Sequence, residues 1–381
     1  MNNGEISEVV NRMLWGRAAG RCQFDGCNRP LWKSDVTQEE VNVAERAHIW
    51  AASDDGPRGS DSVPTEKLNS MENLLLFCHD CHRTIDKAKD GGRYTAELLL
   101  TWKKNHEERV ERVTGIASSK TSHIVTYGAP VGDHSSPLTY TAAAPSLFPE
   151  HYPAEDRAIS LEMLGSAWRD REPDFWPREE ENLRKRFDRD LRPRLESGDI
   201  RHMSLFGFAP QPLLILFGSL LTDIPAAQTR QLRREPQGWA WPTSQEPTQF
   251  SVHRPSTTTG TPALVLSLSA TINDDRIHRV LGPDACIWRI SVDCVGRDCI
   301  GSTGDLAAFR DTARRLIDEI KAAHGEQAAL HIFPAIPISA AIDFGRIRMP
   351  KADTAWVVYD ESKELGGFIE ALTIGTTGVS S

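Results

Sequence analysis

Two pairs of cysteines in the first quarter of the chain constrain its fold more than any other feature. Cys22 and Cys27 form one pair, and Cys78 and Cys81 form the other. Four thiolates at these spacings can surround a zinc ion tetrahedrally, and such a site stabilises a small domain that has little core of its own. The alternative, free buried thiols, fits either pair alone better than both together. Because the total of seven cysteines is also odd, we expect a structural zinc site rather than disulfides.

Side chains suited to catalysis lie beside these cysteines. Residues 70–77 contain an apolar, strand-like stretch, and a helix is expected from His82 to about residue 89. Residues 41–50 alternate weakly, as in a second strand, and carry His48 near its end. Imidazole titrates near neutral pH and serves as a general base or as a metal ligand. The pattern predicts a small α+β domain that combines a zinc site with histidine chemistry.

The length of 381 residues is too great for one ordinary domain, so we expect two. Residues 114–120 are small, polar and without pattern, which indicates a boundary. We expect a first domain over residues 1–115, a linker over 116–122 and a second domain over 123–381. Alternating apolar strands and helices predict that the second domain is α/β with a parallel sheet. The expected strands are 203–208, 213–217, 263–268, 286–292, 330–333 and 356–359, and the expected helices include 162–195 and 306–323.

The charge of the chain argues against constitutive binding of nucleic acid. The net charge is −9, and residues 1–118 carry 16 Lys and Arg against 19 Asp and Glu. Tight DNA binding draws on several phosphate contacts, so this balance fits an enzyme that relies on a metal ion and needs assembly to become effective. The chain has no apolar run of the roughly 18–20 residues that span a membrane and no signal peptide. We therefore expect a cytoplasmic protein without a membrane partner.

Four stretches of the first domain resemble the HNH endonuclease family in its zinc-bearing ββα-metal form. They are Ala47-His48-Ile49, Asp55-Gly56-Pro57-Arg58, Glu72-Asn73-Leu74 and the segment from Cys78 to Asp86. The resemblance covers roughly residues 15–110. It implies that Cys22, Cys27, Cys78 and Cys81 hold a structural zinc ion and that the domain is a metal-dependent nuclease.

The resemblance also assigns roles to individual residues. His48 would be the general base that activates water for attack on a phosphodiester, and Asn73 would brace the turn between the two strands and orient His48. His82 would ligate a catalytic divalent cation, magnesium or a similar ion. Many members of the family have Asp, Glu or His directly before the base, whereas this chain has Ala47. Asp86 and Glu45 are therefore the candidates for the second protein ligand.

Other histidines of the first domain are expected to be ordinary surface residues. His79 lies between the cysteines of the second pair, where we expect it to be exposed and idle. His106 is expected on the surface of a helix over residues 95–113.

The second domain shows no nucleophile elbow, Walker loop or dinucleotide fingerprint, so we expect it to bind a ligand rather than to catalyse. Gly218-Ser follows an apolar run, as expected where ligands bind beyond strand ends. Residues 231–241 mix arginines with Trp239 and Trp241; arginine can pair with phosphate and tryptophan can stack on a base. The alternative for the tryptophans is packing at the edge of a core.

Several segments of this domain resemble the SAVED domain, namely residues 204–214, 231–241, 331–346 and 356–360. The resemblance implies two fused CARF-like (Rossmann-like) halves that sense a cyclic oligonucleotide. An HNH nuclease joined to SAVED is the architecture of a CBASS anti-phage effector. In that family a cyclic di- or trinucleotide drives self-association, from homodimer to higher oligomer, and so activates degradation of double-stranded DNA. The expected ligand-binding residues are Phe217, Gly218, Trp239, Trp241, Pro334 and Ser339.

Two other functions remain open at this point. The protein could be a restriction-type HNH nuclease whose second domain recognises specific or modified DNA, although the acidic composition argues against this. It could also be a zinc-dependent binding module without catalytic activity.

Overall fold

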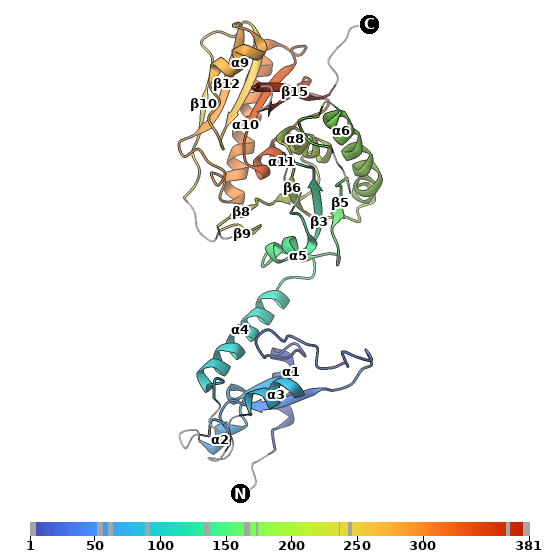
Figure 1. Ribbon diagram of the computed structural model, residues 1–381, viewed down its shortest axis with the longest axis vertical. Helices are drawn as coiled ribbons and strands as arrows, with labels where there is room; N and C mark the ends of the chain where they lie inside the picture. The colour runs from blue at the N-terminus through green and yellow to red at the C-terminus, as the bar shows by residue number, and fades with distance from the viewer. Residues whose placement is uncertain are drawn as a thin grey trace. The chain divides into compact units, whose positions relative to one another are not determined.

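The computed structural model describes residues 5–51, 56–59, 64–87, 92–132, 137–163, 168–172, 174–235, 237–242, 246–362 and 366–375. The chain divides into two compact units, Met1–Ala117 and Ser118–Ser381 (Figure 1). This division falls within the segment predicted to be the linker, and the first strand of the second unit begins there, at Thr121. Asp55, from one of the stretches that resemble HNH nucleases, lies outside the described residues.

The first unit is built around two antiparallel strands followed by a helix. In the pair, His48 lies opposite Leu74 and Ala44 lies opposite Cys78. The helix after the second strand begins at His79, three residues before the predicted start at His82. The elements are α1 (Glu8–Arg17), β1 (Ala44–His48), α2 (Thr65–Leu68), β2 (Leu74–Cys78), α3 (His79–Ile85) and α4 (Ala96–Thr114).

A small apolar core holds these elements together. All five residues of β2 are buried, and the helices α1 and α4 contribute Leu14 and Leu99 to the same cluster. The Oγ1 atom of Thr95 accepts a hydrogen bond from the backbone N–H of Leu98, which caps the start of α4 as its sequence predicts. The prediction that His106 lies on a helix surface is wrong. Its side chain is buried, because α4 packs against the first helix and His106 Nε2 donates to the carbonyl of Ala18 at 3.0 Å.

The second unit contains two large sheets that are mostly parallel and a small antiparallel pair, β8–β9 (Figure 1). One has the strand order β4-β3-β6-β7, with β5 also paired to β3, and all of its pairs are parallel. The other has the order β10-β12-β11-β13-β14-β15, in which β10 and β15 are antiparallel edge strands. The strands are β3 (Thr121–Gly128), β4 (Tyr152–Pro153), β5 (Ile159–Ser160), β6 (Met203–Phe208), β7 (Ala227–Thr229), β8 (Arg233–Arg234), β9 (Gln237–Gly238), β10 (Phe250–His253), β11 (Thr261–Ser267), β12 (Ala285–Val292), β13 (Leu330–Ala335), β14 (Trp356–Ser362) and β15 (Gly367–Ile374).

Helices connect and cover these sheets. The charged helix predicted from residue 162 begins only at Phe175 and continues through a π-helical turn, Phe187–Leu191, into a further helix. The helix predicted over 306–323 is present, with three more residues at its start and one more at its end. The helices are α5 (Tyr140–Ala143), α6 (Phe175–Arg186), α7 (Arg192–Glu196), α8 (Gln211–Leu221), α9 (Asp274–Leu281), α10 (Thr303–His324) and α11 (Ile338–Arg346).

Helices α8 and α11 join the two sheets into one core. α8 follows β6 of the first sheet and packs against β13, β14 and β15 of the second, whereas α11 follows β13 and packs against β6 and β7. The helices touch at two glycines: a Cβ atom on Gly218 would lie 1.9 Å from the carbonyl oxygen of Ile342, and one on Gly345 would lie 2.0 Å from that of Ile215.

The predicted strand over residues 213–217 is wrong, because these residues form part of α8. Nearly every side chain of α8 is buried, since the helix has neighbours on all sides. A helix in such a place is apolar around its whole circumference, and its sequence therefore resembles that of a buried strand. Among the described residues, no helix is both long enough and apolar enough to cross a membrane.

Candidate functional site

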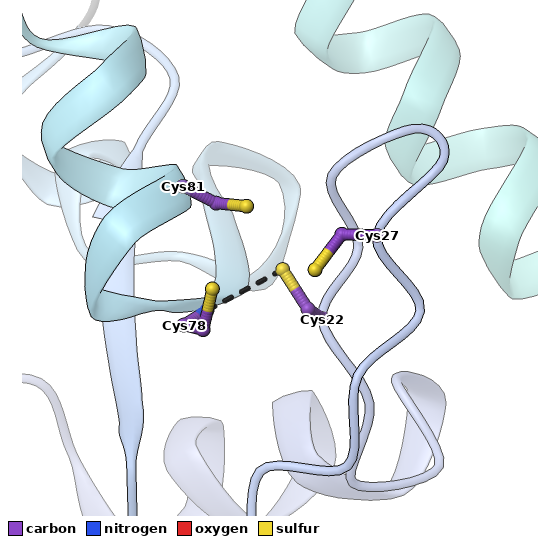
Figure 2. Close-up of side chains that lie close together, drawn as sticks. All are labelled: Cys22, Cys27, Cys78 and Cys81. Atoms are coloured by element: carbon purple, nitrogen blue, oxygen red, sulfur yellow. Dashed lines mark hydrogen bonds between the residues drawn. The ribbon is translucent and has the colours of Figure 1, made fainter. Parts of the chain in front are cut away.

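The four cysteines of the first unit meet at one point (Figure 2). Cys22 and Cys27 come from the loop after α1, Cys78 ends β2, and Cys81 lies in the first turn of α3. Their sulfur atoms all lie within 4.8 Å of one another, and the backbone N–H of Cys78 donates to the Sγ of Cys22 at 3.4 Å. Zinc–sulfur bonds of about 2.3 Å in a tetrahedron place the sulfurs about 3.8 Å apart. The cluster therefore fits a structural zinc ion.

The chemistry of the thiols agrees with this fit. Burial raises the pKa of the Cys22 thiol to about 12, and burial together with the neighbouring Cys22 raises the pKa of Cys81. The thiols of Cys22 and Cys81 therefore keep their protons at neutral pH in the absence of a cation. A zinc ion reverses this preference and binds the thiolate forms, so its binding releases protons and stabilises the fold.

His48 and Asn73 lie at the end of the β1–β2 pair where the chain leaves β1 and enters β2. The Oδ1 of Asn69 accepts a hydrogen bond from His48 Nε2 at 2.9 Å, which leaves Nδ1 as the nitrogen able to take a proton. The buried side chain of Asn73 accepts from the N–H of Trp50 at 2.9 Å and donates to the carbonyls of Trp50 at 3.0 Å and Leu68 at 2.9 Å. Asn73 thus fastens the chain just beyond His48, the position from which the sequence predicts it to brace the turn.

His82 lies between two carboxylates from different elements. Its Nδ1 is 2.6 Å from Oε2 of Glu45 on β1, and its Nε2 is 3.2 Å from Oδ2 of Asp86, one helical turn further on. The hydrogen bond with Asp86 raises the pKa of His82 against the effect of burial, and the contact with Glu45 adds to this. His79, which was expected to be idle, also contacts Glu45, with its Nδ1 2.5 Å from Oε1.

The chemistry of this group suits a divalent cation. One imidazole nitrogen and nearby carboxylate oxygens are ligands for magnesium- or manganese-type ions in hydrolytic sites. Both residues proposed from the sequence as the second ligand, Asp86 and Glu45, are in contact with His82. Ala47, which stands where many HNH nucleases have a ligand, is fully buried among apolar side chains, so a ligand must come from these neighbours.

A cavity of about 770 Å³ lies in the second unit. Its lining comes from the segments that follow the carboxyl ends of β3, β6, β11 and β13, and from the end of β14. Parallel α/β sheets bind ligands in this place, because loops and helix N-termini converge beyond the strand ends. The lining residues are Val131, Pro137, Asp170, Phe208, Ala209, Pro210, Gln211, Leu214, Gln231, Leu232, Arg234, Ser269, Ala270, Arg297, Asp298, Ile336, Pro337, Ile338, Asp360 and Glu361.

Side chains of both charges line this cavity. Arg234 and Arg297 are exposed basic residues, and Asp360 is an acidic residue at the end of β14. Desolvation in the cavity wall raises the pKa of Asp360 to about 7, and the nearby Asp170 adds to this. Because its carboxyl group holds a proton up to about neutral pH, Asp360 can either donate or accept a hydrogen bond there.

Two glutamines fix the cavity wall. Gln211 accepts a hydrogen bond from the backbone N–H of Ile336 at 3.0 Å, which ties the start of α8 to the end of β13. Gln231 accepts from the backbone N–H and hydroxyl of Ser339 at 3.0 and 2.8 Å, which orients the start of α11.

The six residues predicted to bind the ligand are not brought together and are not part of this lining. Phe217 and Gly218 lie inside α8, and Pro334 is buried within β13. Trp239 is buried against Phe206, with ring centroids 5.2 Å apart, and Trp241 packs against the main core. Ser339 is fully buried and reaches the cavity only through Gln231. Applying the strand-end rule to the strands predicted at 203–208 and 330–333 would have indicated Pro210, Gln211 and residues 336–338 instead.

Comparisons with known families agree with the two units. Residues 183–374, half of the chain, match the SAVED family model, described as the SMODS-associated and fused to various effectors sensor domain. Residues 22–89 match the HNH_2 model, described as HNH endonuclease. The search of curated proteins found no match.

Among solved structures, the chain is similar to the Acinetobacter baumannii Cap4 SAVED/CARF-domain containing receptor with the cyclic trinucleotide 2'3'3'-cAAA. The TM-score is 0.44 at 11% identity, over 82% of this chain and 60% of that one. The Moraxella osloensis Cap4 receptor gives a TM-score of 0.42 at 11% identity, over 82% and 70%. This chain thus spans about 60% of the length of the Acinetobacter receptor.

The family matches correspond to the features described above. The HNH match includes the cysteine cluster, the β1–β2 pair and α3, and the SAVED match includes most of the strands and helices that surround the cavity. The chain therefore belongs to the SAVED family and carries at its N-terminal side an HNH endonuclease domain, the domain of a metal-dependent phosphodiester hydrolase.

Proposed function

We propose that this protein is a metal-dependent endonuclease that degrades double-stranded DNA when a cyclic oligonucleotide binds to its SAVED domain, as an effector of CBASS-type anti-phage defence. The observation that carries the proposal is the presence, in one chain, of the His48–His82 site and of a large cavity beyond the strand ends of a sensor-family domain. The HNH family match supports the hydrolytic chemistry.

In the first unit, Met1–Ala117, which we call the nuclease unit, different side chains have different roles in phosphodiester hydrolysis. His48, held through Nε2 by Asn69, accepts at Nδ1 the proton of the attacking water. Asn73 keeps the backbone beside His48 in place through its bonds to Trp50. His82, with Asp86 or Glu45, would hold the divalent cation, which when bound supplies positive charge against the leaving oxygen.

In the sensor unit, the cavity offers two arginines to the phosphate groups of a ligand that carries nucleobases, beside the four acidic side chains of Asp170, Asp298, Asp360 and Glu361. Arg234 and Arg297 can pair with phosphate groups, and the carboxyl group of Asp360 can meet the donor and acceptor edge of a base. The two sheets that contribute to the cavity would correspond to the two CARF-like halves expected of a SAVED domain. We assign a cyclic di- or trinucleotide to this place.

Activation would act through assembly. The first 118 residues carry no excess of basic side chains, so a single copy is expected to bind DNA weakly. A ligand that binds the assembled form more tightly than the resting form shifts the protein toward assembly. Several nuclease units then act on one DNA molecule with a raised effective concentration, which compensates for weak binding by each.

One experiment tests the whole proposal. The full chain is incubated with plasmid DNA and Mg²⁺ or Mn²⁺, with and without each member of a panel of cyclic dinucleotides and trinucleotides, and the size of the protein is measured in parallel. We expect cleavage with at least one cyclic nucleotide, a larger particle under the same conditions, and no cleavage by the His48→Ala variant.

Other outcomes separate the alternatives. Cleavage of particular DNA without any cyclic nucleotide would favour a restriction-type nuclease. Cleavage that survives in His48→Ala would refute the assigned base. Zinc binding without cleavage under all conditions would favour a binding module.

A further inference from the structure

A single arginine joins the separate parts of the nuclease site. The side chain of Arg58 is only 4% exposed. Its Nε donates to the carbonyl of Ile49 at 2.7 Å, and its Nη1 donates to the carbonyl of Ile85 at 2.8 Å. Its Nη2 donates to the carbonyl of His48 at 3.2 Å and to Oδ1 of Asp86 at 2.8 Å. One guanidinium group thus contacts the end of the strand that carries His48 and the end of the helix that carries His82.

The two oxygens of Asp86 have different partners. Oδ1 accepts from Arg58, and Oδ2 contacts Nε2 of His82 at 3.2 Å. Rotation of the carboxylate away from His82 would therefore break an ion pair whose arginine is buried and whose carboxylate is partly buried. Arg58 fixes the direction in which the second oxygen of Asp86 points.

The backbone conformation of Arg58 argues for a role beyond packing. Four hydrogen bonds, one of them to the carboxylate of Asp86, compensate the burial of its guanidinium group. Its φ, however, is +57°, in the left-handed region that non-glycine residues rarely adopt. Strained residues of this kind cluster at functional sites, where the surrounding contacts hold them.

We propose that Arg58 is a positioning residue of the nuclease: it holds the carboxylate of Asp86 toward His82 so that the two side chains can bind the divalent cation together. This inference rests on the proposed nuclease function, and Arg58 acts through Asp86 rather than on the DNA or the cation. A lysine would keep the positive charge, but its ammonium group lacks the planar fork that satisfies three carbonyls and one carboxylate at once.

The test measures cation binding directly, without DNA or activator. Binding of Mn²⁺ to the zinc-loaded full chain is measured by calorimetry for the wild type, Arg58→Met and Arg58→Lys, and also for Asp86→Asn and the Arg58→Met/Asp86→Asn double variant. Arg12→Met is the matched control, because Arg12 is a surface arginine paired with Glu8 and 74% exposed. Zinc content and the melting temperature report whether the unit is still folded.

Removal of a partner that orients a metal ligand lowers metal affinity by about 10- to 100-fold, and we expect a loss of this size for Arg58→Met. Arg58→Lys should lose less, and Arg12→Met should match the wild type. Since Arg58 acts through Asp86, the double variant should bind Mn²⁺ no more weakly than Asp86→Asn alone. If Arg58→Met does not fold, the comparison is made with Arg58→Lys, alone and combined with Asp86→Asn.

Three results would overturn the inference: wild-type Mn²⁺ affinity in a folded Arg58 variant, wild-type affinity in Asp86→Asn, or losses that multiply in the double variant. These results are distinguishable from failure of the proposed function. A protein that shows the expected Mn²⁺ binding but cuts no DNA with any cyclic nucleotide would contradict the nuclease proposal and leave the role of Arg58 intact.

Discussion

His82 on α3 and Glu45 on β1 meet through a contact of 2.6 Å between Nδ1 and Oε2, so the helix and the strand of the nuclease unit are joined at the site itself. Because His82 supplies the nitrogen ligand in the proposed site, His82→Ala should lower DNA cleavage by at least about 100-fold. The rate of plasmid cleavage in the presence of an activating cyclic nucleotide measures this effect.

Zinc content is the control for that variant. His82 is not part of the four-cysteine cluster, so one zinc ion per chain should remain. Substantial cleavage by a His82→Ala protein would show that His82 is not a ligand of the catalytic cation.

The cysteine cluster predicts a separate effect on stability. Cys78→Ser replaces one of the four sulfurs that lie within 4.8 Å of one another. The first unit has a small core, so loss of zinc should unfold it and abolish cleavage, whereas the second unit should melt as in the wild type. Calorimetry and zinc analysis measure the two effects. Cys294→Ser, at an exposed cysteine, is the matched control and should change neither. A Cys78→Ser protein with an intact first unit would show that zinc is not structural.

The crossing of α8 and α11 predicts a steric effect. Gly218→Ala places a Cβ atom 1.9 Å from the carbonyl oxygen of Ile342, so the two helices must separate. Overpacking of this kind costs about 1–3 kcal/mol or more, and the melting temperature of the second unit should fall accordingly. Gly304→Ala in α10 is the control, because its nearest contact is 3.4 Å away and alanine favours a helix. Equal stability of the Gly218→Ala protein and the wild type would contradict this packing.

Asp360 predicts a pH dependence with a definite sign. Its pKa is raised from 3.8 to about 7 in the folded protein. Between pH 4 and pH 7, the unfolded chain has lost this proton while the folded protein keeps it. The free energy of unfolding therefore falls progressively as pH rises through this range, and the loss stays constant above it. The Asp360→Asn variant has no such proton. Its melting temperature relative to the wild type should therefore rise from pH 4 to pH 7 and then stay level. A difference that does not change with pH would show that Asp360 titrates normally.

The same group should influence the proposed ligand. An ionised Asp360 repels phosphate and cannot donate a hydrogen bond, so the affinity for an activating cyclic nucleotide should weaken as pH rises through about 7. Calorimetric titrations at pH 6 and pH 8 measure this change, and Asp360→Asn should reduce it. A stronger affinity at pH 8 would contradict the assignment of Asp360 to the ligand site.

Local patterns predicted the nuclease unit well. The cysteines, the two strands and the helix lie within short segments in which the residue types alone indicate the structure. The four sulfurs come together as expected. His79 is exposed as predicted, but it also contacts Glu45, and the prediction that His106 lies on the surface was wrong. The partners of these histidines, Glu45 and the carbonyl of Ala18, come from distant segments, and the sequence does not reveal such contacts.

The sensor unit was harder to predict. Its strands at 203–208 and 286–292 were visible as apolar runs, but the apolar helix α8 was mistaken for a strand because burial on all sides removes the helical period. The cavity is assembled from residues after several strands, such as Gln211 and Ile338, and from Asp360 within β14, which share no motif. Phe217 and Trp239 are conspicuous in the sequence, yet their side chains are buried in the hydrophobic core.

Helices α8 and α11 lie between the two sheets, which limits how the sensor can respond. Each helix starts at the cavity and packs against both sheets: besides their contacts with the other sheet, Phe217 of α8 contacts Tyr127 of β3, and Phe344 of α11 contacts Trp356 of β14. Gln211 and Gln231 add hydrogen bonds at both starts. Any closure of the two sheets over an occupant of the cavity would therefore have to displace both helices. In the proposed assembly, the sensor domain would therefore signal through the outer surface that it presents to a neighbouring copy.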